Sequence, residues 1–143
     1  MKIPKHNCTL EEVVNFYRNS DVYRRLSSSS QKDYESHLQA TILTQVEGKT
    51  LGGYRCKNLK VRHITQAYEQ WLQVGTRTAN YRRSVLSAAW KHAMRYDVMI
   101  HNPIALVQTV AEKPRRVHWS REQVSIFLDT AYSDFRWRSI GLI

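Results

Sequence analysis

Apolar residues recur every three to four positions in several separate segments of this chain, and this spacing constrains the fold more than any other feature. The first segment begins at Thr9, whose hydroxyl can cap the amide of Glu12 while the Glu12 carboxylate reaches back. Its apolar face consists of Leu10, Val13, Val14 and Tyr17. No segment alternates steadily between apolar and polar residues, as a half-buried strand would. The spacing therefore predicts an all-α fold.

A short extra turn is expected over Val22 to Leu26, followed by a second long helix. Ser28 and Gln31 have the spacing of a second capping box, and the helix is expected from about Ser28 to Val46. Its apolar positions follow at four-residue steps: Tyr34, Leu38, Ile42 and Val46.

Two further helices are expected on either side of Gly75. Thr65 is expected to cap a short third helix, which Gly75 closes as a C-terminal glycine does. A fourth helix is expected over about Thr76 to Met99, and Asn102-Pro103 prevents its continuation. The apolar positions of the two helices are Ala67, Tyr68, Trp71, Leu72, Ala79, Val85, Leu86, Ala89, Trp90, Ala93 and Tyr96.

The stretch from Gly48 to Ile64 is different in character, because it holds three glycines and no acidic residue. We interpret it as a long connection or loose hairpin with solvated charges rather than as a contact surface. Its basic residues are Lys49, Arg55, Lys57, Lys60 and Arg62.

The segment Ala105 to Val117 has the composition of a basic linker stiffened by Pro114. Beyond it, Ser120 and Gln123 form a third capping box, with Trp119 placed to pack on Val124 as a hydrophobic staple. The buried face of this fifth helix is expected to be Val124, Phe127, Leu128 and Ala131, and a sixth helix is expected from near Asp134. The organisation predicted is a helical domain over residues 1–104, a linker over 105–117 and the start of another domain over 118–143.

The formal net charge of +10 indicates a polyanionic partner such as nucleic acid. No apolar run approaches the roughly 20 residues that span a bilayer, and the N-terminus does not resemble a signal peptide, so we expect a cytoplasmic protein without a membrane partner. Cys8 and Cys56 stand far apart and form no C-x-x-C pair. The sequence thus predicts two free thiols, no metal site and no cofactor.

Four sequence motifs, in this order and spacing, carry a resemblance to a known family. They are Ser27 to Tyr34, Thr76 to Leu86 with its threonines, Asn80 and basic residues, Ala88 to Ala93 followed by Asn102-Pro103, and Trp119 to Val124. Together they resemble the core-binding domain and the opening of the catalytic domain of the tyrosine recombinase, or phage integrase, family. The resemblance implies a four-helix, SAM-like domain that clamps one face of double-stranded DNA opposite a catalytic domain.

In that family a tyrosine attacks the scissile phosphate and forms a 3′-phosphotyrosine link, while arginine, lysine and histidine-type residues stabilise the phosphate without a metal or nucleotide cofactor. The resemblance also implies other recombinase protomers as partners, and a phage or bacterial mobile-element origin. No catalytic residue is assigned in this chain. Arg136 and Arg138 lie too early and lack the preceding glycine of the family pattern, and the sequence ends before the expected motif. We therefore expect a truncated recombinase that is inactive alone.

The candidate DNA-binding residues lie at two helix starts and in the linker. A helix N-terminus offers free amides and partial positive charge, and hydroxyl and guanidinium groups add phosphate contacts. Asn80 could read an adenine edge or contact a phosphate. The candidates are Ser28, Ser29, Gln31, Lys32, Thr76, Arg77, Thr78, Asn80, Tyr81, Arg83, Lys113, Arg115 and Arg116.

Two other functions stay open on the sequence alone. One is a short protein that occupies a recombination site without cutting it, and the other is a helical transcription regulator. The regulator hypothesis requires a compact helix-turn-helix, which the long fourth helix and the basic linker fit poorly.

Overall fold

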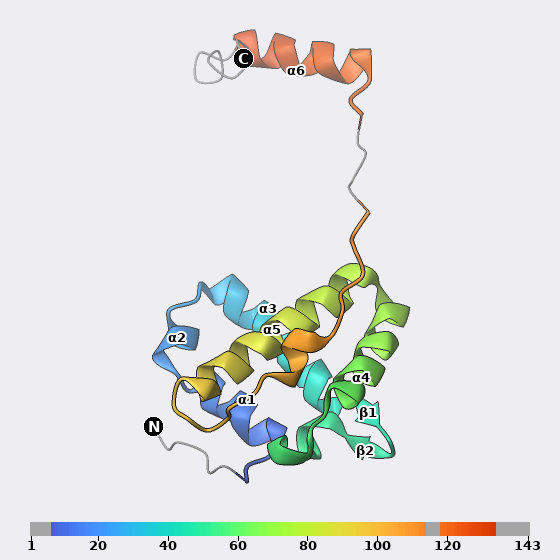
Figure 1. The fold of residues 1–143 in the computed structure, drawn as a ribbon. Helices are drawn as coiled ribbons and strands as arrows, with labels where there is room; N and C mark the ends of the chain where they lie inside the picture. The colour runs from blue at the N-terminus through green and yellow to red at the C-terminus, as the bar shows by residue number, and fades with distance from the viewer. Residues whose placement is uncertain (1–6, 114–117, 134–143) are drawn as a thin grey trace. The chain divides into compact units, whose positions relative to one another are not determined.

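The structure is a computed structural model that describes residues 7–113 and 118–133, and the chain forms two compact units, Met1–Glu112 and Lys113–Ile143. The mostly helical fold predicted from the spacing is confirmed (Figure 1). In chain order the described elements are α1 (Leu10–Arg18), α2 (Asp21–Arg24), α3 (Ser28–Leu43), β1 (Gln45–Val46), β2 (Lys49–Thr50), the 3-10 helices η1 (Leu51–Gly53) and η2 (Cys56–Asn58), α4 (Val61–Val74), α5 (Thr76–Met94), η3 (Pro103–Leu106) and α6 (Arg121–Ser133).

The predicted start of the first helix is confirmed. The Glu12 amide donates to the Thr9 hydroxyl at 3.3 Å, and the Thr9 amide donates to the Glu12 carboxylate at 2.7 Å. The apolar face predicted for this helix is buried throughout. The expected extra turn is present as α2, whose N-cap is Ser20.

The start of α3 differs from the prediction. Ser27, not Ser28, caps the helix, because its hydroxyl accepts from the Ser30 amide at 3.2 Å. The Gln31 side chain instead donates to the carbonyl oxygens of Arg24 and Leu26, at 3.1 and 2.8 Å. The serine run offers several equivalent hydroxyls, so the capping register was wrong by one residue.

The helix α3 also ends earlier than expected, at Leu43, because the chain turns into a β-hairpin. Val46 pairs with Lys49 across a two-residue turn, Glu47-Gly48, in which both residues have positive φ, 52° and 76°. This is the backbone of a type I′ turn, which matches the twist of a hairpin. A hairpin is thus present, but it spans residues 45–50 and begins within the predicted helix, and the rest of the expected connection forms η1, η2 and the start of α4.

The helix α4 begins four residues before the predicted cap. Thr65 lies inside the helix, where its hydroxyl donates to the Val61 carbonyl at 3.0 Å. The Lys60 amide at the N-cap is satisfied by Nδ1 of His63 at 3.0 Å. Gly75 closes the helix as predicted, and its φ of +152° is one that other residues rarely adopt.

The helix α5 supplies the centre of the core and packs against α1, α3, α4 and η3. It ends at Met94 rather than Met99, and Asp97 with φ +56° then redirects the chain. Tyr96 therefore leaves the helical register, and it is 42% exposed instead of buried. The other predicted apolar positions of α4 and α5 are buried, apart from the partly buried Leu72.

Cys8 and Cys56 are free, as predicted, but the fold brings them together. The Cys56 amide donates to the Cys8 carbonyl at 2.9 Å, and the flanking residues Thr9 and Arg55 form a β-bridge. The hydrogen bond with the neighbouring thiol and the burial both raise the pKa of Cys56. This thiol is therefore protonated and unreactive at neutral pH.

In the second unit, the capping box of α6 is confirmed. The Ser120 amide donates to Oε1 of Gln123 at 2.9 Å, and the Gln123 amide donates to the Ser120 hydroxyl at 3.2 Å. Of the face predicted to be buried, only Ala131 is, and Val124 and Phe127 are each 39% exposed. A single helix cannot bury its own apolar face. The Phe127 ring instead meets Trp119, with centroids 5.2 Å apart, and the sixth helix predicted near Asp134 lies outside the described residues.

His92 is a buried titratable group in the core. Its ring packs against Phe16, Tyr17 and Tyr96, and neither ring nitrogen has a hydrogen-bond partner in the described structure. Burial, helped by the charge of Arg95, lowers the pKa of His92 from its ordinary value of 6.5. Protonation is therefore easier in the unfolded chain than in the folded one.

This pKa shift gives the free energy of unfolding a pH dependence. It should hold its full value above about pH 6.5, where His92 is neutral in both states, and fall as the pH drops towards the lowered folded pKa. Urea titrations across this range should show a smaller decrease for His92→Leu than for the wild type. The exposed His101→Gln variant should keep the wild-type decrease, and an unchanged decrease in His92→Leu would contradict the assignment.

Candidate nucleic-acid interface

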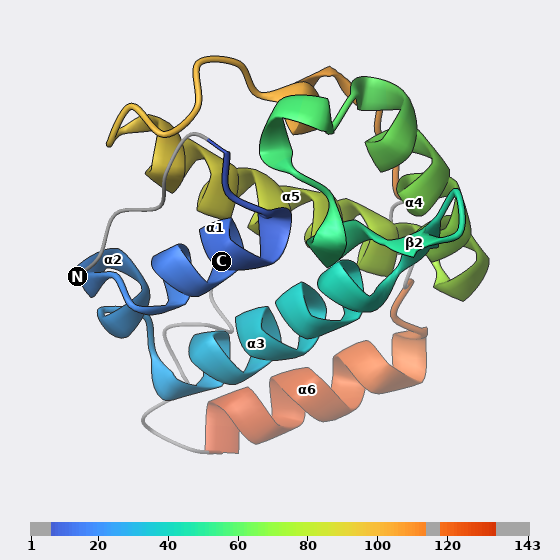
Figure 2. The ribbon, with the colours of Figure 1, turned by 90° about the horizontal axis from the view of Figure 1, so that it is seen from below.

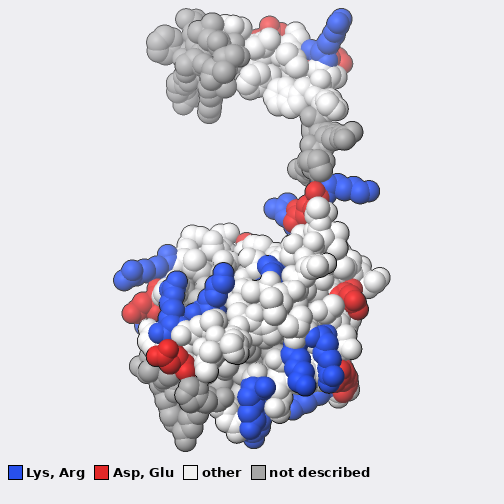
Figure 3. Space-filling model, in the orientation of Figure 1, with Lys and Arg blue, Asp and Glu red and all other residues white. Residues whose placement is uncertain are grey.

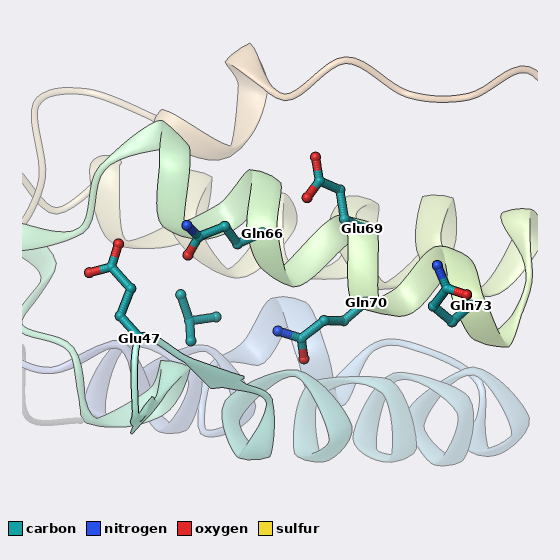
Figure 4. A pocket seen from close by; sticks show the side chains of 6 residues that line it. Glu47, Gln66, Glu69, Gln70 and Gln73 are labelled. Carbon is teal, nitrogen blue, oxygen red and sulfur yellow. The ribbon is translucent and has the colours of Figure 1, made fainter.

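The hollow in Figure 4, about 350 Å³, lies between the hairpin and α4 and is lined by Glu47, Glu69 and three glutamines, a set that repels phosphate. Among the described residues no three His, Cys, Asp or Glu side chains are grouped to hold a metal ion. None of the described helices combines the length and apolar character that crossing a bilayer requires.

The two helices that carry most of the candidate residues, α3 and α5, pack directly against each other (Figures 1 and 2). The Tyr81 ring of α5 lies 6.0 Å from Tyr34 and 4.7 Å from His37 of α3, measured between centroids. The first turns of both helices lie along the upper edge of the unit in Figure 1. The fold thus brings the two helix starts, 48 residues apart in sequence by their first residues (76 minus 28), to one side of the domain.

At the start of α3, the candidates divide into free and engaged side chains. Ser28, Ser29 and Lys32 are exposed, and their side chains make no hydrogen bond or ion pair with the described residues, so they are open to a ligand. Gln31 is half-buried, and its amide holds the loop between α2 and α3. Its role in the described structure is to fix the position of the first turn.

At the start of α5, the N-cap residue is Gly75, which has no side chain to cap the first amides. Arg77 is exposed and Thr76 and Thr78 are half-buried in the first turn, which has no acidic residue. The partial positive charge of a helix N-terminus therefore adds to the guanidinium charge of Arg77. This combination suits an anionic ligand such as a phosphodiester.

Asn80 is engaged in a closed set of hydrogen bonds. The Val110 amide donates to the Tyr68 hydroxyl at 2.9 Å, and that hydroxyl donates to Oδ1 of Asn80 at 2.6 Å. Nδ2 of Asn80 then donates to the Val110 carbonyl at 2.9 Å, and it lies 3.4 Å from the Glu112 carboxylate. The side chain thus fastens the end of the first unit to α4 and α5.

Arg83 makes a similar attachment one turn further along α5. Its Nη2 donates to the Ala105 carbonyl at 3.0 Å, next to the buried Ile104 of η3. Residues 105–112, expected to begin the linker, therefore belong to the first compact unit. The chain leaves this unit along the side where α5 begins (Figure 1).

The structure adds Arg82, which the sequence analysis did not select. Its helical register with Val85 and Ala89 turns it towards the core, so the guanidinium is partly buried and its Nε has no hydrogen-bond partner in the described structure. Burial lowers the pKa of Arg82. The pKa of His37 on α3 is also lowered, first by its own burial and then by the nearby charge of Arg82. A charged residue on the apolar side of a helix was the sequence signal for this site.

In the linker, Lys113 is exposed, and the candidates Arg115 and Arg116 lie outside the described residues. Figure 3 shows Lys and Arg side chains in separate groups over the first unit, with acidic side chains between them. The positive charge is therefore not confined to one patch.

Comparison with known proteins finds similar structures but no similar sequences. The sequence matches no protein-family profile, and no curated protein matches it either. Two solved structures resemble it. One is a lambda integrase tetramer bound to a Holliday junction, with a TM-score of 0.70, 16% sequence identity and 90% of this chain covered. The other is a lambda integrase dimer bound to a COC′ core site, with a TM-score of 0.68, 17% sequence identity and 88% of this chain covered. The chain spans 37% and 35% of the integrase chains it matches. It shares the fold of these integrase fragments.

The hydrogen bonds around Asn80 can be tested through the Val110 amide. Tyr68→Phe removes the hydroxyl that accepts from this amide, which costs about 1–1.5 kcal/mol of local stability, so its hydrogen exchange should accelerate about tenfold. Tyr54→Phe, which removes a hydroxyl bond to the hairpin carbonyl of Val46, is the matched control and should leave Val110 exchange unchanged. Equal exchange of Val110 in the wild type and in Tyr68→Phe would show that these bonds do not hold the segment.

Proposed function

We propose that this chain binds double-stranded DNA at a recombination site, as the core-binding part of a tyrosine recombinase of the integrase type. The observation that carries the proposal is the shared fold with lambda integrase structures that contain DNA junctions or core sites. The sequence motifs that resemble the integrase family support it independently of the fold. The proposal assigns the first compact unit, residues 1–112, to DNA binding and 118–143 to the start of a catalytic domain, so the connection expected over 105–117 is shortened to 113–117.

The proposed contact surface is the side of the first unit where α3 and α5 begin. Lys32 and Arg77 are exposed there, and the partly buried Arg82 adds a positive charge that acts on His37 of α3. A phosphate oxygen would supply the anion that these cations lack, and the hydroxyls of Ser28 and Ser29 would add neutral donors. Phosphate neutralisation would then supply most of the affinity.

Asn80 takes a different role in this proposal from reading a base. Both ends of its amide already bond to Tyr68 and Val110, so reading an adenine edge would require breaking bonds of 2.6 and 2.9 Å. We assign it as a positioning residue that guides the chain out beside the DNA-contacting turns. Arg83 acts in the same way through the Ala105 carbonyl.

The proposal extends to partners and place of action. Double-stranded DNA is the direct partner, and other recombinase protomers assemble with the full-length protein on that DNA. In this proposal, recombination takes place in the cytoplasm of a prokaryotic host, where phage or mobile-element DNA is recombined with its target DNA.

Binding should depend on single cations at the two helix starts. Lys32→Ala and Arg77→Ala should each weaken binding to any duplex and lower the slope of log affinity against log salt by about one, because each removes one phosphate contact. Lys91→Ala removes an exposed cation from the last turn of α5 and should change neither quantity appreciably. Fluorescence anisotropy of a labelled duplex across a salt series measures both.

Two outcomes would contradict this surface. One is affinity for duplex DNA that ignores salt. The other is a Lys32→Ala/Arg77→Ala double variant that binds as tightly as Lys91→Ala.

A further inference from the structure

The hairpin and the start of α4 enclose a second cationic feature, which the proposed function does not use. A hollow of about 530 Å³ is lined by residues from 47 to 63, and all of them except Glu47 belong to the stretch first interpreted as a solvated connection. Its cations come from β2, the loop after η1, η2 and the start of α4, and all five are exposed: Lys49, Arg55, Lys57, Lys60 and Arg62.

The charges of this hollow are poorly balanced within the described structure. The only carboxylate in its lining is Glu47, which lies 3.6 Å from Nε of Arg62 and 3.4 Å from Nε2 of His63. The ammonium of Lys49 lies 5.3 Å from the Tyr54 ring centroid, which attracts it without neutralising it. Five cations and one carboxylate leave a formal charge of four on the lining, 5 minus 1.

The backbone that carries these cations is held in place. The Tyr54 hydroxyl donates to the Val46 carbonyl at 2.8 Å, which ties the loop to the hairpin. The Leu10 amide donates to the Tyr54 carbonyl at 2.9 Å, which ties the same loop to α1. The cations are thus presented by a fixed frame rather than by a freely moving loop.

An extended polyanion suits this surface better than a small anion does. The hollow is open, and its cations are exposed side chains spread over several elements rather than buried donors aimed at one point. Duplex DNA carries about one negative charge per 1.7 Å of helix axis, so its backbone can meet several such cations together.

The hollow also lies away from the proposed DNA surface. The hairpin and η2 are in the lower part of the first unit in Figure 1, whereas the first turns of α3 and α5 are along its upper edge. Figure 3, in the same orientation, shows Lys and Arg side chains over this lower part. We propose that this hollow binds the phosphate backbone of a second DNA segment, so that one copy of the chain can hold two duplexes.

Bridging between two duplexes tests this proposal. Donor-labelled and acceptor-labelled duplexes of unrelated sequence are mixed with the chain at low salt, and energy transfer reports their proximity. A variant with Lys49→Gln, Lys57→Gln and Lys60→Gln should lose the transfer and weaken second-duplex binding at least tenfold, while first-duplex affinity stays within about threefold. The salt slope of the second event should fall by about 0.9 per lost contact.

The matched control removes the same number of exposed cations elsewhere, through Arg25→Gln, Lys91→Gln and Arg95→Gln, and should still bridge. Sedimentation of the complex establishes that bridging comes from one copy and not from a pair. Bridging by the wild type and the control but not by the hairpin variant supports the proposal. Single-duplex binding without bridging, bridging by the hairpin variant, or bridging only through paired copies overturns it and leaves the proposed function intact.

Two results would also bear on the proposed function. Failure to bind any duplex would overturn both this inference and the proposed function. Loss of all DNA binding in the hairpin variant, with no effect of Lys32→Ala/Arg77→Ala, would make the hollow the sole DNA surface. It would overturn this inference and the proposed contact surface at α3 and α5, but not DNA binding itself.

Discussion

The burial of α5 is the constraint on which the rest of the first unit depends. Its apolar side, with Leu86 and Trp90 almost fully enclosed, is the surface on which α1, α3, α4 and η3 pack. Trp90 also donates its indole N–H to the His101 carbonyl at 2.7 Å, which fixes the chain after the helix. Truncation of a buried tryptophan to alanine typically lowers the free energy of unfolding by about 3–5 kcal/mol. The elements packed on α5 therefore depend on it for their stability. The first turn of the same helix carries Arg77, which couples the core to the proposed DNA surface.

A second consequence of this arrangement is that the end of the first unit is attached to α5, the helix proposed to contact DNA. The Tyr68 and Asn80 side chains bond both the amide and the carbonyl of Val110, and Arg83 bonds the Ala105 carbonyl. In the proposed recombinase, the direction in which the connection leaves the first unit must suit the position of the duplex. Side chains next to Arg77 and Tyr81 set that direction here, so contact and positioning share one helix.

The helical class and the buried faces of α1, α4 and α5, apart from Tyr96, could be predicted from the sequence, because apolar spacing and core burial have the same cause. The predicted face of α6 is largely exposed in the described structure. The exact ends of the helices were harder to predict from the sequence. Thr65 looks like a cap but lies inside α4, where its hydroxyl bonds to Val61, and only the tertiary fold reveals this. The candidate cations were selected by proximity to helix starts or by their place in the linker. Arg82 had a sequence signal, its place on the apolar side of α5, but the partial burial of its guanidinium is seen only in the fold. The basic residues of 49–62 lie on the hairpin, the following loop, η2 and the start of α4, and the sequence does not show that these elements enclose one hollow.

The central claim is that the first turns of α3 and α5 form the DNA-binding side of this fold. The most direct measurement is a titration of the isotope-labelled chain with a duplex at substoichiometric amounts, followed through its backbone amide NMR shifts. The account predicts that the largest early changes fall in residues 28–32 and 76–82, and that changes around Lys57 and Lys60 appear only with further duplex. Early changes confined to α1 and α2, with the first turns of α3 and α5 unperturbed, would contradict it.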